Sequence, residues 1–151
     1  MLRRIVAFVV AVVVMALLGS IAHSLFVQDA WSMAAAQIEG TDPVAIPMAE
    51  RVSWITHDLI GLEPLYGGLT GIALLVAFLA AGLVARFTGL RPIVFAVAGA
   101  VAILVMYTAM KMSLGSVGVF GARGTFGMAA QMVAGLIAGL LFALLTRPRT
   151  T

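Results

Sequence analysis

Four long stretches of this chain contain no Asp, Glu, Lys or Arg, and they constrain its fold more than any other feature. A bilayer core of about 30 Å needs about 20 helical residues at about 1.5 Å each, and all four stretches meet or approach that length. Backbone N–H and C=O groups must be paired internally in hydrocarbon, so each stretch is predicted to be a transmembrane helix. The stretches are residues 5–28, 64–85, 92–110 and 124–146.

Two other interpretations of these stretches are less favoured. Membrane-spanning β-strands would alternate apolar and polar residues over about 10 positions, and a run such as VAFVVAVVVMALL does not alternate. The opening MLRR followed by apolar residues is typical of a signal peptide. However, Ala22-His23-Ser24 is a poor cleavage site, and the uncharged run exceeds the usual apolar region of about 7–15 residues. We therefore expect a retained helix.

Composition supports a membrane protein and excludes several other classes. Of the 151 residues, 63% are hydrophobic and only 10% are charged, whereas soluble domains carry roughly 25% charged residues. The absence of cysteine excludes disulfides, thiolate metal sites and cysteine nucleophiles. The sequence pI is about 10.2. Its basic residues nevertheless lie singly or in pairs at the ends of apolar runs, so a nucleic-acid partner is not expected.

The charged residues also predict an orientation. With four spans, both termini and the 86–92 turn lie on one side, which holds six of the nine basic residues. The positive-inside rule places that side in the cytoplasm of a bacterial-type inner membrane. All six acidic residues lie in the segment between the first two spans, which becomes an acidic extracytoplasmic face.

This segment, residues 28–64, is predicted to contain one or two short helices. Asp29 can cap a helix that runs to Ile38 and ends at the sequence GTDP. Pro47 suits the first turn of a second helix, which carries a stripe of apolar residues at intervals of four, three and four. Trp54 would then lie near the headgroups if this helix rests on the membrane surface. Alternatively, its apolar stripe packs over the bundle or onto a partner.

Glycine recurs at every third position from Gly115 to Gly127, in the sequence GSVGVFGARGTFG. A step of three residues falls about 60° short of a full turn, so five such glycines cannot form one seam on a helix. We interpret Gly115 to Arg123 as a tight or flexible connection between the last two spans. An anion-binding nest supported by Arg123, or a carbonyl-lined filter, is the less favoured functional alternative.

The last span contains a G-x-x-x-G motif at Gly135 and Gly139, beside Ala134 and Ala138. Small residues let membrane helices approach closely, and this close packing drives their association. Contact within the four-helix bundle is the favoured interpretation, and a dimer or partner interface is the alternative.

Few polar side chains lie within reach of the membrane. Tyr107 and Lys111 are four residues apart and share a helix face, so with Asp58, Glu63 and Arg123 they form a candidate polar cluster at the outer mouth. Salt-bridged interfacial anchors are the favoured interpretation of this cluster. Gln131 is expected to hydrogen-bond across helices rather than to bind a substrate.

No catalytic, cofactor-binding or metal-ligating residue is predicted. His23 and His57 are the only histidines, and no H-x-x-H or H-E-x-x-H motif occurs. A haem between the two imidazoles is geometrically possible but remains a minority interpretation. No nucleophile has a base at useful spacing, so enzymatic activity is not expected.

The sequence therefore predicts an all-α, integral membrane four-helix bundle in a single domain, residues 1–151, with one or two short extracytoplasmic surface helices between the first two spans. The spans are expected at about 5–27, 65–85, 93–114 and 125–145. The predicted function is non-enzymatic: an accessory subunit or homo-oligomer that acts through helix contacts with itself or another membrane protein in the bilayer. The alternative is a small multi-copy transporter or channel with Lys111, Tyr107 and Gln131 near the pathway.

Overall fold

The computed structural model describes residues 1–115, 122 and 124–147, without the side chains of residues 62–64 and 114. Four α-helices account for most of the described chain. They are α1 (Leu2–Glu39), α2 (Met48–Thr88), α3 (Arg91–Leu114) and α4 (Thr125–Leu145). This confirms the all-α fold class predicted from the sequence.

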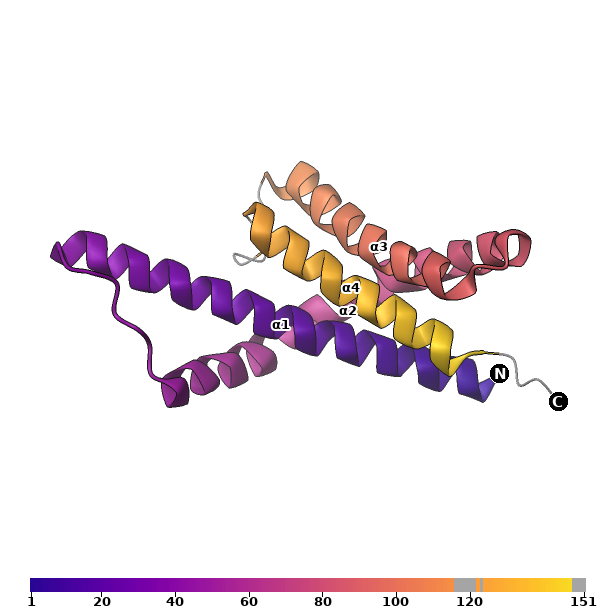
Figure 1. Cartoon of the computed structure of the whole chain (residues 1–151), viewed down its shortest axis with the longest axis horizontal. Coiled ribbons are helices and arrows are strands. Elements are labelled where there is room, and N and C mark those ends of the chain that lie inside the picture. Colours follow the sequence, from indigo (N-terminus) through magenta and orange to yellow (C-terminus); the bar gives the residue numbers. More distant parts are fainter. Residues whose placement is uncertain (116–121, 123, 148–151) are drawn as a thin grey trace.

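Each helix packs against the preceding and following helices, and α4 returns to pack against α1. The four helices thus form a closed ring in which α1 faces α3, and α2 faces α4, across the centre. The N-terminus and the C-terminal end of α4 lie at one end of the molecule, which we call the terminal end (Figure 1). At the opposite end, α1 and the start of α2 extend beyond the other two helices.

Four helical segments are long and apolar enough to cross a membrane: Leu2–Glu39, Leu65–Thr88, Arg91–Ser113 and Thr125–Leu145. In the most apolar 18 residues of each, only 22–33% of residues are buried inside the molecule. The remaining apolar side chains face outward, as a lipid environment requires. The chain is therefore a small multi-pass membrane protein embedded in a lipid bilayer.

The helix expected between the first two spans is present, but it is the beginning of α2 rather than a separate element. The prediction that Asp29 starts a new helix is wrong, because α1 continues through Asp29 to Glu39. A capping residue begins a helix only where the preceding chain is not helical. Residues 28–39 contain neither Gly nor Pro and are rich in alanine, so the first helix has no reason to stop there.

The ends of α1 and α2 lie where the sequence placed them. Gly40 follows α1 with φ 67°, and Gly89 follows α2 with φ 68°. This left-handed conformation is readily adopted by glycine, which has no Cβ. Pro92 occupies the first turn of α3, where its missing N–H costs nothing.

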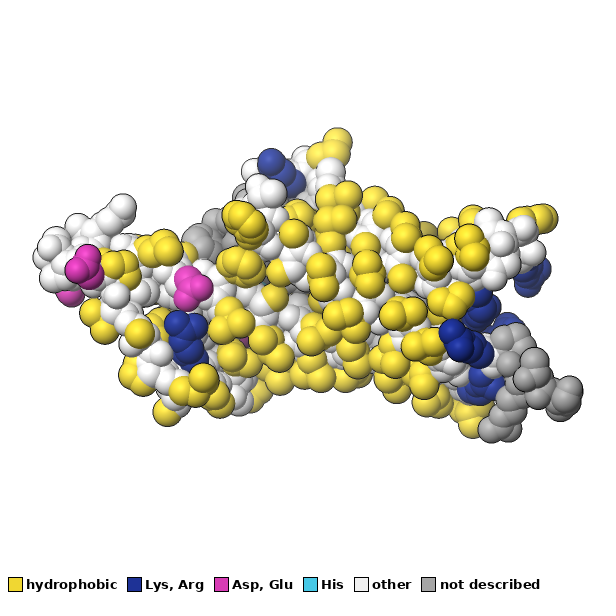
Figure 2. Space-filling view, in the orientation of Figure 1, with side chains coloured by type: hydrophobic (Ala, Val, Ile, Leu, Met, Phe, Trp, Pro, Cys, Tyr) yellow, Lys and Arg dark blue, Asp and Glu magenta, His cyan; other side chains and the backbone are white. Residues whose placement is uncertain are grey.

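The extended parts of α1 and α2 form what we call the hairpin, residues 29–61. Charge is separated along the long axis of the molecule (Figure 2). Acidic side chains lie in the hairpin, whereas a group of basic side chains lies at the terminal end. The hairpin follows the direction of α1 away from the bundle, so its second helix packs beside α1 instead of lying across the bundle (Figure 1).

The G-x-x-x-G motif of α4 faces α3 of the same chain. Gly135 and Gly139 are buried, and their backbones meet Gly99 and Phe95 of α3. A methyl group added at Gly99 would overlap the carbonyl oxygen of Gly135, and one added at Gly139 would overlap that of Phe95. This face is therefore used within the bundle, where the small residues allow two helix backbones to touch.

One phenylalanine from each helix contributes to an aromatic cluster near the terminal end: Phe8, Phe78, Phe95 and Phe142. The Phe78 and Phe142 rings stack with centroids 4.7 Å apart, which links α2 to α4 across the ring of helices. Phe95 lies 5.6 Å from Phe78 and 5.2 Å from Phe142. Phe8 meets Phe78 edge-on at 6.3 Å, so all four helices are joined here.

Candidate functional site

A chain of buried hydrogen bonds joins all four helices on the hairpin side of the bundle. Tyr107 of α3 donates its hydroxyl proton to the Tyr66 hydroxyl oxygen of α2 at 3.2 Å. Tyr66 donates to Gln131 Oε1 of α4 at 2.7 Å. Gln131 Nε2 in turn donates to the backbone carbonyl of Gly19 in α1 at 2.8 Å. We call these four residues the polar chain.

The polar chain is closed to lipid and water. Tyr107 and Gln131 are fully buried, and Tyr66 is only 7% exposed. Gly19 contributes by having no side chain, because a Cβ there would lie 2.8 Å from Gln131 Oε1 and would overlap the Tyr66 hydroxyl. Buried polar groups of this kind are costly unless paired, so their bonds fix how the four helices rotate against one another.

A buried polar stripe on α1 continues from Gly19 toward the hairpin. Ser20, Ser24 and Gln28 are spaced four residues apart and share one helix face. Gln28 Nε2 donates to Ser24 Oγ at 3.0 Å and to the Arg51 carbonyl at 3.2 Å. Ser20 Oγ and Gln28 Oε1 have no hydrogen-bond partner among the described residues. This stripe gives the buried face of α1 a polar half and an apolar half.

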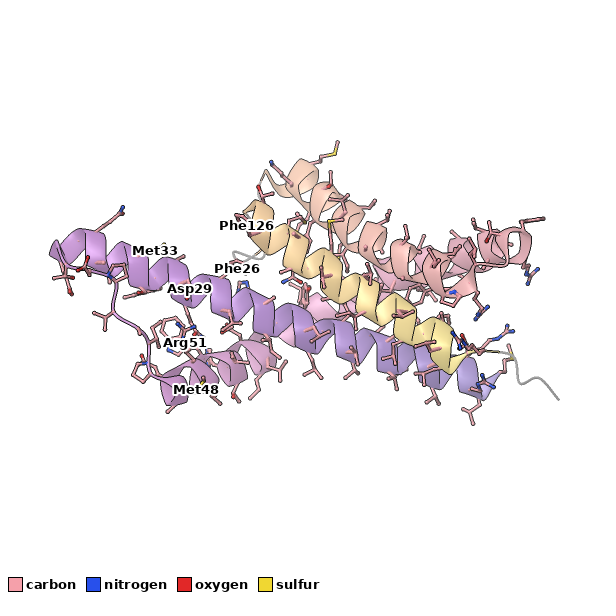
Figure 3. The ribbon with its side chains drawn as sticks, viewed as in Figure 1. Phe26, Asp29, Met33, Met48, Arg51 and Phe126 are labelled. Atoms are coloured by element: carbon pink, nitrogen blue, oxygen red, sulfur yellow. The ribbon has the colours of Figure 1, made fainter. Side chains whose placement is uncertain are left out.

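The hairpin is held together by contacts between α1 and the start of α2. Asp29 and Arg51 face each other across the two helices with a nitrogen–oxygen distance of 3.5 Å (Figure 3). The Trp31 and Trp54 rings meet edge to face at 6.4 Å. Ser32 Oγ donates to the Val44 carbonyl at 3.0 Å. These contacts make the hairpin an ordered element that projects from the bundle.

On α1 the buried polar side chains stop at the level of Gly19, whereas Thr70, one turn beyond Tyr66 on α2, is polar and fully buried. Toward the terminal end, the buried face of α1 is lined by Ala7, Ala11 and Met15. Leu74 and Ile103, both fully buried, continue this apolar core on α2 and α3. Among the described side chains, no continuous polar row therefore connects the two ends of one copy. The hydrogen bonds of the polar chain hold the four helices to one another.

The structure does not gather the candidate outer cluster at one exposed site. Tyr107 is buried in the polar chain, whereas Lys111 is exposed at the end of α3. Asp58 is half-buried on α2 and lies close enough to His23 for their charges to interact. The side chain of Glu63, and Arg123 as a whole, lie outside the described residues.

The glycine ladder is described only at its two ends. Gly115 ends α3 with φ 72°, Gly124 precedes α4, and Gly127 is buried in the first turns of α4. Gly118 and Gly121 lie outside the described residues, and so do the nest and filter hypotheses that rest on them.

The two histidines occupy different environments. His23 is buried in α1 at 8% exposure, whereas His57 is exposed on the hairpin. Among the described residues, no group of three or more His, Cys, Asp or Glu side chains is arranged to hold a metal ion.

Sequence reasoning anticipated Gln131 as an interhelical hydrogen-bonding residue but missed Tyr66 and Gly19. Tyr66 lies at the end of a predicted span, where tyrosine is usual at the membrane interface. The spacing of Gly19, Ser20, Ser24 and Gln28 was the available signal, because it places small or polar residues along one face of α1.

Comparison with known proteins finds no matching family model, no matching curated protein and no matching solved structure. Arguments about function therefore rest on the residues described above.

Proposed function

We propose that this protein is a non-enzymatic membrane component that acts through helix contacts, as an accessory subunit that binds another membrane protein through the hairpin. The observation that carries this proposal is the hairpin itself, which combines an ordered backbone, exposed apolar side chains and an excess of carboxylates outside the four-helix ring.

The length of α1 supports a role beyond the lipid. Its 38 residues extend about 57 Å at about 1.5 Å each, almost twice the thickness of a hydrocarbon core of about 30 Å. Large apolar side chains remain exposed on the hairpin, including Trp31 at 62%, Met33 at 61% and Ile38 at 87%. Large apolar side chains left exposed outside the bilayer are typical of a protein interaction surface.

The charge of the hairpin favours a different protein over a second copy of this one. Residues 29–61 carry five carboxylates and a single arginine, Arg51, which is already paired with Asp29. Two such surfaces would repel each other, because like charges across an interface are unfavourable. The expected partner is therefore a membrane protein with a basic surface outside the bilayer.

The transporter alternative has weaker support. Tyr107 and Gln131, two of the three residues expected near its pathway, are fully buried within a single copy. They are also bonded to neighbouring helices, so lining a pore between copies would require breaking the polar chain. We therefore favour the contact-based role.

We further infer that the membrane is of the bacterial inner type, with both termini in the cytoplasm and the hairpin outside. This orientation follows from the positive-inside rule and from the arginines at the terminal end. A cysteine introduced at Met33 should react with a membrane-impermeant maleimide in intact cells, whereas one at Thr88 should not. The opposite pattern would reverse the orientation.

The partner role is tested by site-specific photocrosslinking in native membranes. A photoreactive residue at Met33 or Ile38 should give one discrete adduct heavier than a dimer of this chain. The same residue at Val97, an exposed position on α3, should give none. The double variant Glu39→Gln/Asp42→Asn should weaken the Met33 adduct at equal expression. Adducts with lipid or with a second copy alone would reject the partner role.

A further inference from the structure

A groove of about 840 Å³ lies between α1 and α2 near the terminal end. Its walls include Ile5, Leu79 and Leu83, which are more than half exposed, and its buried side is formed by rings of the aromatic cluster. This volume falls within the range of about 300–1,000 Å³ that is usual for small-ligand sites.

Three arginines and no carboxylates line the same groove: Arg4 on α1, Arg86 on α2 and Arg91 on α3. Arg4 is close enough to Arg91 for their positive charges to repel. All six acidic residues of the chain lie between positions 29 and 63, so none of them neutralises these arginines from the groove wall. Converging cations without an acid make a site that favours an anion.

Arg91 is positioned on the groove wall by several contacts. One terminal nitrogen donates to Thr146 Oγ1 at 2.6 Å, and its guanidinium carbon lies 4.7 Å from the Phe95 ring centroid. Its Nε is buried and has no hydrogen-bond partner among the described residues. Arg3 differs, because it donates to the carbonyls of Leu145 and Arg147. The Arg3 side chain is thus directed to the end of α4, whereas Arg91 lies on the groove wall.

The length of the groove matches one leaflet of a bilayer. Along α2 it is lined from Leu75 to Arg86, a stretch of twelve residues whose ends lie about 16 Å apart along the helix axis. Half of a hydrocarbon core of about 30 Å is nearly the same length. The arginines lie at the ends of the spans, at headgroup depth, while the apolar wall runs toward the membrane centre. One anionic head and one acyl chain would therefore meet matching surfaces.

We propose that this groove binds one acidic phospholipid, with its phosphate held by Arg4, Arg86 and Arg91 and an acyl chain lying along α2 against the aromatic cluster. Guanidinium groups bind phosphate oxygens through charge-assisted, often bidentate hydrogen bonds. Basic pockets between membrane helices are suited to acidic lipid headgroups. This proposal is independent of the hairpin and of the partner proposed for it.

The first test measures lipid binding to the purified full chain by native mass spectrometry. Phosphatidylglycerol and phosphatidylcholine with identical acyl chains are titrated separately, and inorganic phosphate is titrated as a competitor. One phosphatidylglycerol per chain should bind about tenfold or more tightly than phosphatidylcholine. The phosphatidylglycerol headgroup carries a net negative charge for the arginines to bind, whereas the choline group cancels that charge in phosphatidylcholine. Equal affinity for the two lipids would overturn the proposal, as would displacement by inorganic phosphate at the lipid's own concentration.

The second test uses matched variants. Arg86→Gln should weaken phosphatidylglycerol binding about tenfold, because one of the three cations is lost. Arg147→Gln removes the same charge at the same end, outside the groove lining, and should change it less than about twofold. Equal losses in the two variants would indicate general charge attraction rather than a site.

Gly82→Leu tests the acyl part of the groove. Gly82 lines the groove, and a Cβ there meets nothing within 4 Å, so the larger side chain can project into the space without disturbing the helices. Binding of both lipids should fall, whereas Gly68→Leu, at an equally open position of α2 outside the groove, should leave it unchanged. Thermal unfolding of each variant without lipid confirms that the fold is retained. Unaltered binding by the folded Gly82→Leu protein would contradict the proposed acyl site.

Discussion

The polar chain and the aromatic cluster connect the same four helices in opposite ways. Each takes one residue from every helix, and each links α2 directly to α4 across the centre of the ring. Along α2, Tyr66 and Phe78 are twelve residues or about 18 Å apart, so the two connections brace opposite halves of the bundle. One uses directed hydrogen bonds and the other uses ring packing.

The two connections therefore contribute differently: the polar chain sets the rotation of each helix, and the aromatic cluster holds the helices together by close packing. Lipid is as apolar as a phenylalanine ring, so the aromatic cluster gains from close packing rather than from leaving water. The hydrogen bonds of the polar chain form only when donors and acceptors align, so they select one rotation of each helix. The polar chain is also sealed, whereas the aromatic cluster forms one side of an open groove.

The largest effect is expected from Phe78→Ala, because Phe78 contacts the other three rings of the aromatic cluster. We expect a loss of about 3 kcal/mol, near the lower end for a buried phenylalanine, because lipid in the groove can partly fill the space. Unfolding in mixed micelles with increasing dodecyl sulfate, followed by circular dichroism, measures it. Phe87→Ala serves as control, since Phe87 is 89% exposed on the same helix. Equal losses of stability in the two variants would mean that the aromatic cluster stabilises the bundle no more than an exposed phenylalanine does.

A smaller loss, about 2 kcal/mol, is expected from Gly19→Ala. The added methyl overlaps the Tyr66 hydroxyl and crowds Gln131, so the polar chain must separate. Gly71→Ala is the matched control, because its methyl would make an ordinary contact with Val12 at 3.7 Å. The same titration compares them. If both glycines tolerate alanine equally, close approach at Gly19 is not needed for the polar chain.

The smallest effect is expected from Tyr66→Phe, which removes two hydrogen bonds while retaining the ring. Hydrogen bonds between membrane helices average about 0.6 kcal/mol, so a loss of about 1 kcal/mol is expected. Tyr107→Phe removes one bond and should cost about half as much. Adding Tyr107→Phe to Tyr66→Phe should cost almost nothing, because the bond between the two hydroxyls is already gone. Full additivity would show that the two hydroxyls are not coupled.

The sequence was sufficient to predict the fold class and the four spans, which depend on local composition. Uncharged stretches located the four spans, and the 86–92 turn separated the second from the third. Asp29 misled the prediction because a good capping residue can equally continue a helix. The composition of residues 28–39 was the better guide at that position.

The rotation of each helix, and therefore which of its side chains are buried, could not be predicted. Tyr107 and Lys111 share a helix face by spacing, but the end of α3 lies beyond the core, so one is buried and the other exposed. Tyr66 lies at the end of a predicted span, and only the packing of α2 shows that it is turned inward. The groove depends on how far α1 and α2 separate near Phe78, and no local pattern encodes that distance.

The unbroken course of α1 has a mechanical consequence. A continuous helix from Leu2 to Glu39 is a stiff shaft, so torque applied to its outer tip is transmitted along its length rather than absorbed at a hinge. Gly19 lies near the middle of α1, and its backbone carbonyl accepts a hydrogen bond from Gln131. Twisting the tip would therefore strain both its contacts with the start of α2 and the Gly19–Gln131 hydrogen bond.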